Sequence, residues 1–146
     1  IKSINVQEIG LLNRELARFI SQQGHNDMLM VVDAGFAIPK GLDVVDLSLA
    51  INEPTVPRVL AVLKDYFSVE KLILARETKD VSPSLYKIMI NSFEENLNVE
   101  LIEHLALKEK SKQVKLVIRT GDFTAYANII LVSGAGKRWY LEKQHK

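Results

Sequence analysis

Polar residues flank an apolar run of five residues near the start of the chain. His25 and Asp27 precede the run Met28–Val32, and Asp33 follows it. Five consecutive apolar residues between two aspartates are typical of a strand that is buried on both faces. Such a strand would place His25 and Asp27 at one end and Asp33 at the other. Because ligands gather beyond the carboxyl ends of strands in α/β sheets, Asp33 is the better-placed acid.

Histidine is the side chain best suited to exchanging protons near neutral pH. The chain has three: His25, His104 after a second apolar run, and His145, which we expect to be solvated. A single histidine at the boundary of an element is more often an ordinary polar residue than a catalyst. His25, Asp33 and His104 could form a metal site of two histidines and one carboxylate, but their spacing does not require one. We therefore expect no metal, and the lack of a glycine-rich phosphate-binding pattern predicts no nucleotide cofactor.

The segment 119–128 lies between two expected strands and contains more functional groups than a turn needs. Turn chemistry explains Gly121 and Asp122 but explains Tyr126 and Asn128 poorly. On an extended backbone these alternate residues would point to one side and present a phenol and an amide together. This pair is suited to binding the hydroxyl groups of a sugar or polyol.

Helices and strands are expected to alternate along the chain and to position these groups. Asn13 could cap a first helix and Gly24 could end it in the left-handed conformation. Pro54 and Pro57 suit the opening of a second helix, and Ser82 could cap a third. A charged helix is expected around 107–113, and strands are expected at 28–32, 44–49, 72–75, 99–102, 116–118 and 129–132. This order predicts one α/β layered domain, with a largely parallel sheet flanked by helices.

The composition is that of a soluble globular domain. The 146 residues are 47% hydrophobic and 25% charged, with a net charge of +1 and no cysteine. A near-neutral charge gives no electrostatic reason to expect nucleic acid as a partner, and no apolar run approaches the ~18 residues of a membrane span. Without cysteine, disulfides and thiolate chemistry are excluded. The N-terminus lacks a hydrophobic signal core, so we expect a cytoplasmic protein with no membrane partner.

The segment 134–146 differs in composition from residues 1–133, which we expect to form the domain. It is basic, contains two glycines and carries the only tryptophan, Trp139, beside Tyr140. It could pack on a neighbouring molecule, but we expect it to fray, with Gly134 and Gly136 as a flexible exit from the last strand.

Almost the whole chain resembles the ribose pyranase / fucose mutarotase family of bacterial sugar-utilisation operons. The resemblance runs from about residue 12 to 132, and its single motifs become specific only as an ordered set. The residues that carry it are Leu12-Asn13, Gly24-His25-Asn26-Asp27, Asp33-Ala34-Gly35-Phe36-Ala37-Ile38-Pro39, Ile118-Arg119-Thr120-Gly121-Asp122 and Tyr126-Ala127-Asn128. It implies an isomerase that interconverts the cyclic forms of a free monosaccharide without cofactor or metal.

The same resemblance assigns roles to individual residues. It implies that His25 is the proton donor and that Asp33 and His104 bind substrate, as do Tyr126, Ala127 and Asn128. It also implies a ring-shaped homo-oligomer, often a decamer, with sites at subunit interfaces.

Two substrates stay open within the family. The pair Phe36-Ala37 is closer to the fucose branch, and Ala125 replaces a proline of the ribose branch. The motif Asp33-Ala34-Gly35, together with His104 and Tyr126-Ala127-Asn128, follows the ribose branch. The resemblance therefore implies either D-ribose or L-fucose as substrate.

Two functions other than catalysis are also compatible with the sequence. A non-catalytic sugar-binding accessory protein of a transport system would make the same hydroxyl contacts through Asp33, Tyr126 and Asn128. It would not need His25 to titrate, so a pH–rate profile would separate the two. A weaker alternative is a structural ring-forming module with Trp139 and Tyr140 as interface anchors.

Overall fold

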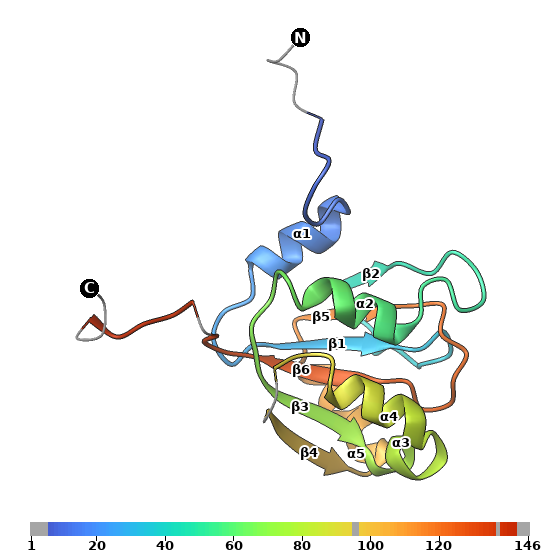
Figure 1. Cartoon of the computed structure of the whole chain (residues 1–146). Coiled ribbons are helices and arrows are strands. Elements are labelled where there is room, and N and C mark those ends of the chain that lie inside the picture. The colour runs from blue at the N-terminus through green and yellow to red at the C-terminus, as the bar shows by residue number, and fades with distance from the viewer. Residues whose placement is uncertain (1–5, 95–96, 137, 143–146) are drawn as a thin grey trace.

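A six-stranded sheet organises the part of the chain that the computed structural model describes, which is residues 6–94, 97–136 and 138–142. Its strand order is β2-β5-β1-β6-β3-β4 (Figure 1). The strands are β1 (Met28–Val32), β2 (Val44–Asp46), β3 (Val69–Ala75), β4 (Asn98–Ile102), β5 (Leu116–Arg119) and β6 (Ile129–Ser133). Only β6 runs against the others, pairing antiparallel with β1 on one side and β3 on the other. The expected α/β domain with a largely parallel sheet is confirmed.

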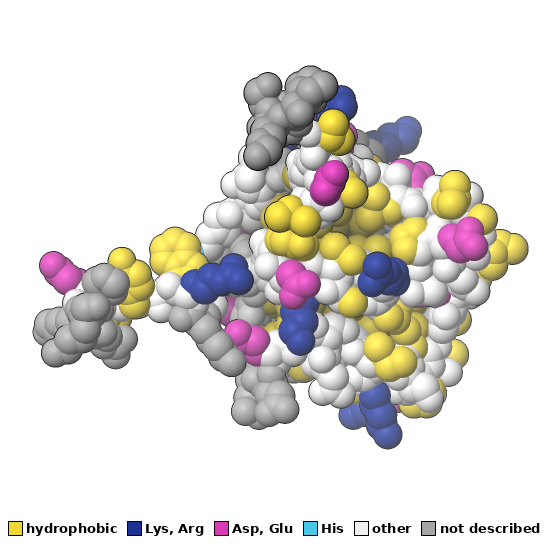
Figure 2. All heavy atoms as spheres, turned by 45° about the horizontal axis from the view of Figure 1, so that its top comes forward, with side chains coloured by type: hydrophobic (Ala, Val, Ile, Leu, Met, Phe, Trp, Pro, Cys, Tyr) yellow, Lys and Arg dark blue, Asp and Glu magenta, His cyan; other side chains and the backbone are white. Residues whose placement is uncertain are grey.

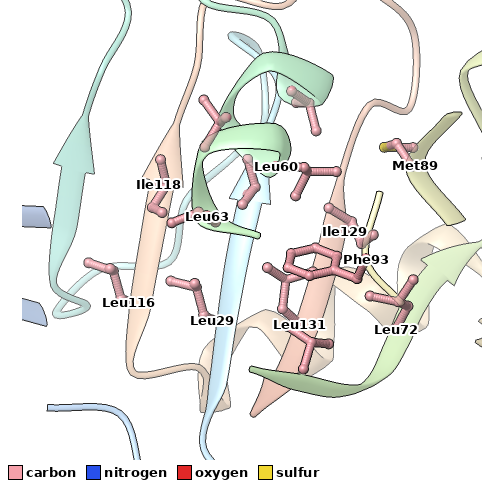
Figure 3. Close-up of a cluster of buried hydrophobic side chains, with 14 of the residues drawn as sticks. Leu29, Leu60, Leu63, Leu72, Met89, Phe93, Leu116, Ile118, Ile129 and Leu131 are labelled. Atoms are coloured by element: carbon pink, nitrogen blue, oxygen red, sulfur yellow. The ribbon is translucent and has the colours of Figure 1, made fainter. Parts of the chain in front are cut away.

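Helices cover both faces of the sheet. They are α1 (Arg14–Ser21), α2 (Val56–Leu63), α3 (Arg76–Val81), α4 (Pro83–Ile90) and α5 (His104–Lys110), which continues into the 3-10 turn Ser111–Gln113. Residues of α1, α2 and α4 pack in the core on one face, where Figure 3 shows Leu60 and Leu63 of α2 among the side chains of the sheet. Leu107 of α5 packs on the other face.

Strand β1 is buried on both faces, as its apolar run predicts. Leu29 and Val31 pack in the core beneath α2, whereas Met30 and Val32 face the core beneath α5. All four are fully buried. Because β1 lies in the middle of the sheet, its two ends carry His25 and Asp33 to opposite edges of the domain.

The signals at the ends of helices are only partly confirmed. Asn13 caps α1, its side chain accepting a hydrogen bond from the Leu16 N–H at 2.9 Å. The expectation for Gly24 is wrong, because α1 already ends at Ser21, with Gln22 as its C-cap, and Asn26 takes the left-handed conformation instead, with φ of 70°. The Gly24 N–H is instead bound by the carboxylate of Asp27 at 2.7 Å.

The later helices differ more from expectation. Thr55 caps α2, and Pro57 lies in its first turn. Ser82 precedes α4 but makes no side-chain cap, since its hydroxyl donates to the Ala125 carbonyl at 2.9 Å. Helix α5 begins at His104, three residues earlier than expected, and α3 was not expected.

The sheet ends at Ser133, and the described part of the tail leaves it beside β3. The Gly134 N–H donates to the Ser68 carbonyl at 3.1 Å, so the expected flexible exit begins with an anchored residue. Trp139 is 73% exposed on a segment that extends away from the sheet (Figure 1). The division into a domain 1–133 and a tail 134–146 stays a prediction, and His145 lies outside the described residues.

Candidate functional site

Asp33 is the first residue after β1, at the carboxyl end of the parallel strands. Its backbone N–H donates to Asn128 Oδ1 at 2.9 Å, and its Oδ1 accepts the Gly35 N–H at 3.1 Å. Asn128 is 1% exposed and immediately precedes β6. This amide therefore fixes the backbone from which the Asp33 carboxylate projects.

Burial makes the Asp33 carboxyl a weaker acid than an ordinary aspartate. Partial removal from water raises its pKa above the ordinary value, and nearby Asp122 acts in the same direction. Hydrogen bonds from the Gly35 N–H, the Asn128 side chain and the Phe36 N–H oppose this shift without cancelling it. A carboxyl with a raised pKa is better able to accept and return a proton near neutral pH.

His104 lies beside Asp33, in contact with two aromatic side chains. Its ring makes edge contacts with Tyr126 and Phe36, at centroid distances of 5.1 and 6.4 Å. Its backbone N–H donates to both carboxylate oxygens of Glu77 at 3.1 Å, which fixes the first turn of α5. The Nδ1 atom of His104 is buried and has no hydrogen-bond partner among the described residues.

Tyr126 does not lie on an extended segment, so that expectation is wrong. It has φ of 61° and forms part of a turn, held by the Thr78 hydroxyl, which donates to its carbonyl at 2.8 Å. Ala127 is fully buried, its methyl group packs in the core, and its N–H donates to Thr124. Ala127 therefore packs beneath the turn and does not line the cavity beside Asp33.

One cavity of about 350 Å³ is lined by Asp33, His104, Tyr126 and Asn128, and its volume is within the range typical of small-molecule pockets. The structure thus brings four predicted residues together although they come from distant parts of the sequence. The lining residues are Asp33, Gly35, Phe36, Ala37, His104, Lys108, Ala125, Tyr126 and Asn128.

Sequence reasoning missed Lys108 and Arg119 at this end of the sheet. Lys108 lines the cavity because it lies four residues after His104, on the same side of α5. Arg119 ends β5 and donates to the Ala34 carbonyl at 3.0 Å and to Asp46 Oδ2 at 3.0 Å. Arg119 therefore holds the loop that follows Asp33. The sequence signal for it was a cation at the end of a buried strand.

His25 lies at the opposite end of the sheet, in a turn fastened to the end of β6. The Ser133 hydroxyl donates to the carbonyls of Gly24 and Asp27, and the Asn26 N–H donates to the Ser133 carbonyl at 2.8 Å. The side chain of His25 is 61% exposed and borders a cavity of about 540 Å³ that also includes Trp139.

Asp27 stabilises the same turn. Its carboxylate lies 2.7 Å from Lys115 Nζ and accepts the Gly24 N–H. The bond from Lys115, followed by the one from Gly24, holds the pKa of Asp27 below its ordinary value. Asp27 is therefore an ionised structural partner of the turn that carries His25.

A single chain does not bring His25 to the cavity beside Asp33. The five residues of β1 that separate the two ends span roughly 16 Å. The expectation that β1 carries His25 and Asp33 to opposite ends is thus confirmed. A site that used both residues would need two copies of the chain.

The described residues contain no group of three or more His, Cys, Asp or Glu side chains that could hold a metal ion. Within the same residues, every helix is too short or too polar to cross a membrane.

Known proteins resemble the chain over most of its length. The sequence model of the RbsD / FucU transport protein family matches residues 7–136. A D-ribose pyranase of Pseudothermotoga lettingae is 38% identical over 125 residues, which are 86% of this chain and 89% of that protein.

Solved structures agree with this relationship. Bacillus subtilis RbsD complexed with D-ribose superposes with a TM-score of 0.85 at 37% identity, covering 90% of this chain and 99% of that one. The fucose mutarotase of Streptococcus pneumoniae, complexed with L-fucose, superposes with a TM-score of 0.70 at 15% identity, covering 85% and 94%. This second likeness shows a shared fold alone. The chain belongs to the RbsD / FucU transport protein family.

Proposed function

We propose that this protein is a D-ribose pyranase, an isomerase that speeds the interconversion of the cyclic forms of free D-ribose. The cavity formed by Asp33, His104, Tyr126 and Asn128 carries the proposal, since it combines a carboxyl of raised pKa with hydroxyl-binding groups. Relatives named D-ribose pyranase are 36–40% identical to this chain, whereas the fucose mutarotase is 15% identical. These identities support D-ribose rather than L-fucose as the substrate.

The reaction needs two proton transfers. A proton must reach the ring oxygen while the anomeric hydroxyl loses one, and the bond between the anomeric carbon and the ring oxygen then breaks to give the aldehyde. In our proposal His25 protonates the ring oxygen, and Asp33 accepts the hydroxyl proton. His104, Tyr126 and Asn128 hold the other hydroxyls, and Ala127 holds the turn between Tyr126 and Asn128 through its backbone bond to Thr124. Closure through a different hydroxyl then exchanges pyranose and furanose forms.

We also propose that the site forms between two copies of the chain, because His25 lies at the far end of β1 from Asp33. Joining the His25 end of one copy to the Asp33 end of the next is a head-to-tail contact, which generates a closed ring when the rotation closes. We propose such a ring, a decamer, acting on free sugar in the cytoplasm.

Exposed apolar surface supports assembly. Figure 2 shows hydrophobic side chains gathered over the face that carries α1 and α2. Ile9 near α1 and Leu49 after β2 are more than four-fifths exposed. Patches of this kind on a folded domain commonly mark contacts with other protein chains.

The alternative is a non-catalytic sugar-binding accessory protein, which a family of transport proteins would include. Proton NMR of exchange between sugar forms distinguishes the two, with D-ribose and L-fucose offered separately to wild type and to His25→Ala. We expect D-ribose exchange to be accelerated and the variant to lose about 10²–10⁴-fold of that rate while remaining folded. Binding of the sugar without accelerated exchange would establish the accessory protein instead.

A further inference from the structure

Glu70 is the extra residue of a β-bulge at the start of β3. Where β3 pairs with β6, Val69 lies opposite Ser133 and Lys71 lies opposite Val132, so Glu70 has no partner across the ladder. Bulges re-aim a side chain and are common beside active sites. Here the bulge brings Glu70 Oε2 to 3.8 Å from His25 Nε2.

Gly134 makes room for this carboxylate. A Cβ on Gly134 would lie 2.7 Å from both Cβ and Cδ of Glu70, a separation that real side chains do not tolerate. The preceding residue, Ser133, fastens the turn that carries His25. The end of β6 therefore fixes the backbone of the histidine and also leaves space for its acidic neighbour.

The other charged groups at this end of the sheet have partners of their own. Asp27 pairs with Lys115, and Lys71 pairs with Glu100. Arg138 of the tail borders a separate cavity with Lys64, Asp65 and Glu94. Within the described residues, His25 is the only ionisable partner of Glu70.

We propose that Glu70 is a positioning residue for His25 and that its carboxylate holds the protonated ring with Nε2 toward β3. This inference rests on the proposed function, in which His25 is the proton donor. With Nε2–H directed at Glu70, the proton that reaches the sugar comes from Nδ1. The Nδ1–H bond breaks as the ring oxygen gains the proton, the ring oxygen leaves the anomeric carbon, and neutral His25 keeps Nε2–H. The hydroxyl proton goes to Asp33, and ring closure reverses both transfers.

Glu70→Gln tests the role of the charge, with Glu100→Gln as the matched control. Both carboxylates are 38–39% exposed, but Glu100 is on β4 and pairs with Lys71 rather than with His25. For D-ribose exchange we expect kcat to fall about tenfold in Glu70→Gln with KM unchanged, and Glu100→Gln to behave as wild type.

Two further variants separate positioning from folding. Glu70→Asp keeps the charge and should recover part of the lost kcat. Gly134→Ala keeps the carboxylate but displaces it, and should lower kcat in the same way while the assembly keeps its size. Equal kcat values in Glu70→Gln and Glu100→Gln would overturn the inference. A raised KM with unchanged kcat would also overturn it, since Glu70 would then bind sugar directly.

The proposed function has its own readout in the same experiment. If wild type accelerates exchange and His25→Ala does not, the function stands whatever Glu70→Gln does. If wild type and His25→Ala are equally inactive, the proposed function fails and the role of Glu70 fails with it.

Discussion

Two inactive variants should restore each other's activity if each site is shared between copies. His25 and Asp33 lie at opposite ends of β1, separated by roughly 16 Å of strand. We expect His25→Ala and Asp33→Asn each to abolish D-ribose exchange when assembled alone. When the two are co-expressed with different tags and purified as mixed assemblies, some interfaces combine an intact His25 from one copy with an intact Asp33 from the next.

The size of the recovery follows from this arrangement. In a random equal mixture, half of the copies supply an intact His25, and half of the neighbouring copies supply an intact Asp33. About one quarter of the sites should therefore be wild type, so the rate should return to about one quarter of the wild-type value. The assay is proton NMR of exchange between ribose forms, normalised to the concentration of chains.

A mixture of two variants from the same half of the site is the control. Asp33→Asn and His104→Ala both damage the cavity at the carboxyl end of β1. No interface in their mixture has that half intact, so its rate should not exceed the average of the rates of the two variants measured separately. If the His25→Ala and Asp33→Asn mixture stayed inactive, although mixed assemblies were isolated, the shared site would be refuted.

Three further changes test the parts of the site separately. Burial raises the pKa of Asp33, so the folded protein loses stability as the pH rises through that raised pKa and the carboxyl ionises. Asp33→Asn should therefore raise Tm at neutral pH, and scanning calorimetry should find no such gain below pH 3.8, the ordinary pKa, where the carboxyl is protonated in both states. Ser133→Ala removes the hydroxyl that binds the Asp27 carbonyl, and should cost about 1–2 kcal/mol in urea unfolding while lowering kcat. Asp122→Ala leaves the buried N–H of Val56 without its acceptor at 2.8 Å, and should cost about 2–3 kcal/mol by the same measurement; unchanged unfolding midpoints would contradict both.

The sequence predicts the strands of the sheet better than their arrangement. Compact apolar runs form β1, the second half of β3 and most of β6, and such runs identify buried strands without stating their direction. The antiparallel course of β6 therefore had no local signal. Helix α3 was missed for a related reason, because Arg76–Val81 lacks apolar periodicity; its one buried residue, Thr78, is held by a bond to the Tyr126 carbonyl.

For the candidate site, too, individual residues could be predicted better than the contacts between them. Asp33 could be located because it follows a strand, but its partner Asn128 lies 95 residues away and meets it only through the pairing of β1 with β6. The left-handed turn at Tyr126 could not be foreseen, because tyrosine rarely adopts positive φ. The role of Glu70 could not be predicted either, because a bulge is defined by how two strands pair and the sequence of one strand does not reveal it.

The surroundings of the two histidines predict different kinetic roles for them. In the proposed reaction the donor loses its proton as the ring opens and regains it as the ring closes, and the side chain of His25 is 61% exposed, so a sugar held by a neighbouring copy can reach it. His104 is wedged between Phe36 and Tyr126, with one nitrogen buried.

We therefore expect His104→Gln to raise KM for D-ribose several-fold with little change in kcat, and His25→Gln to lower kcat at nearly constant KM. NMR exchange rates measured over a range of ribose concentrations separate the two parameters, and circular dichroism of both variants controls for folding. The reverse pattern would make His104 the donor. Because His104 already lies beside Asp33, that result would also remove the reason for a site shared between two copies.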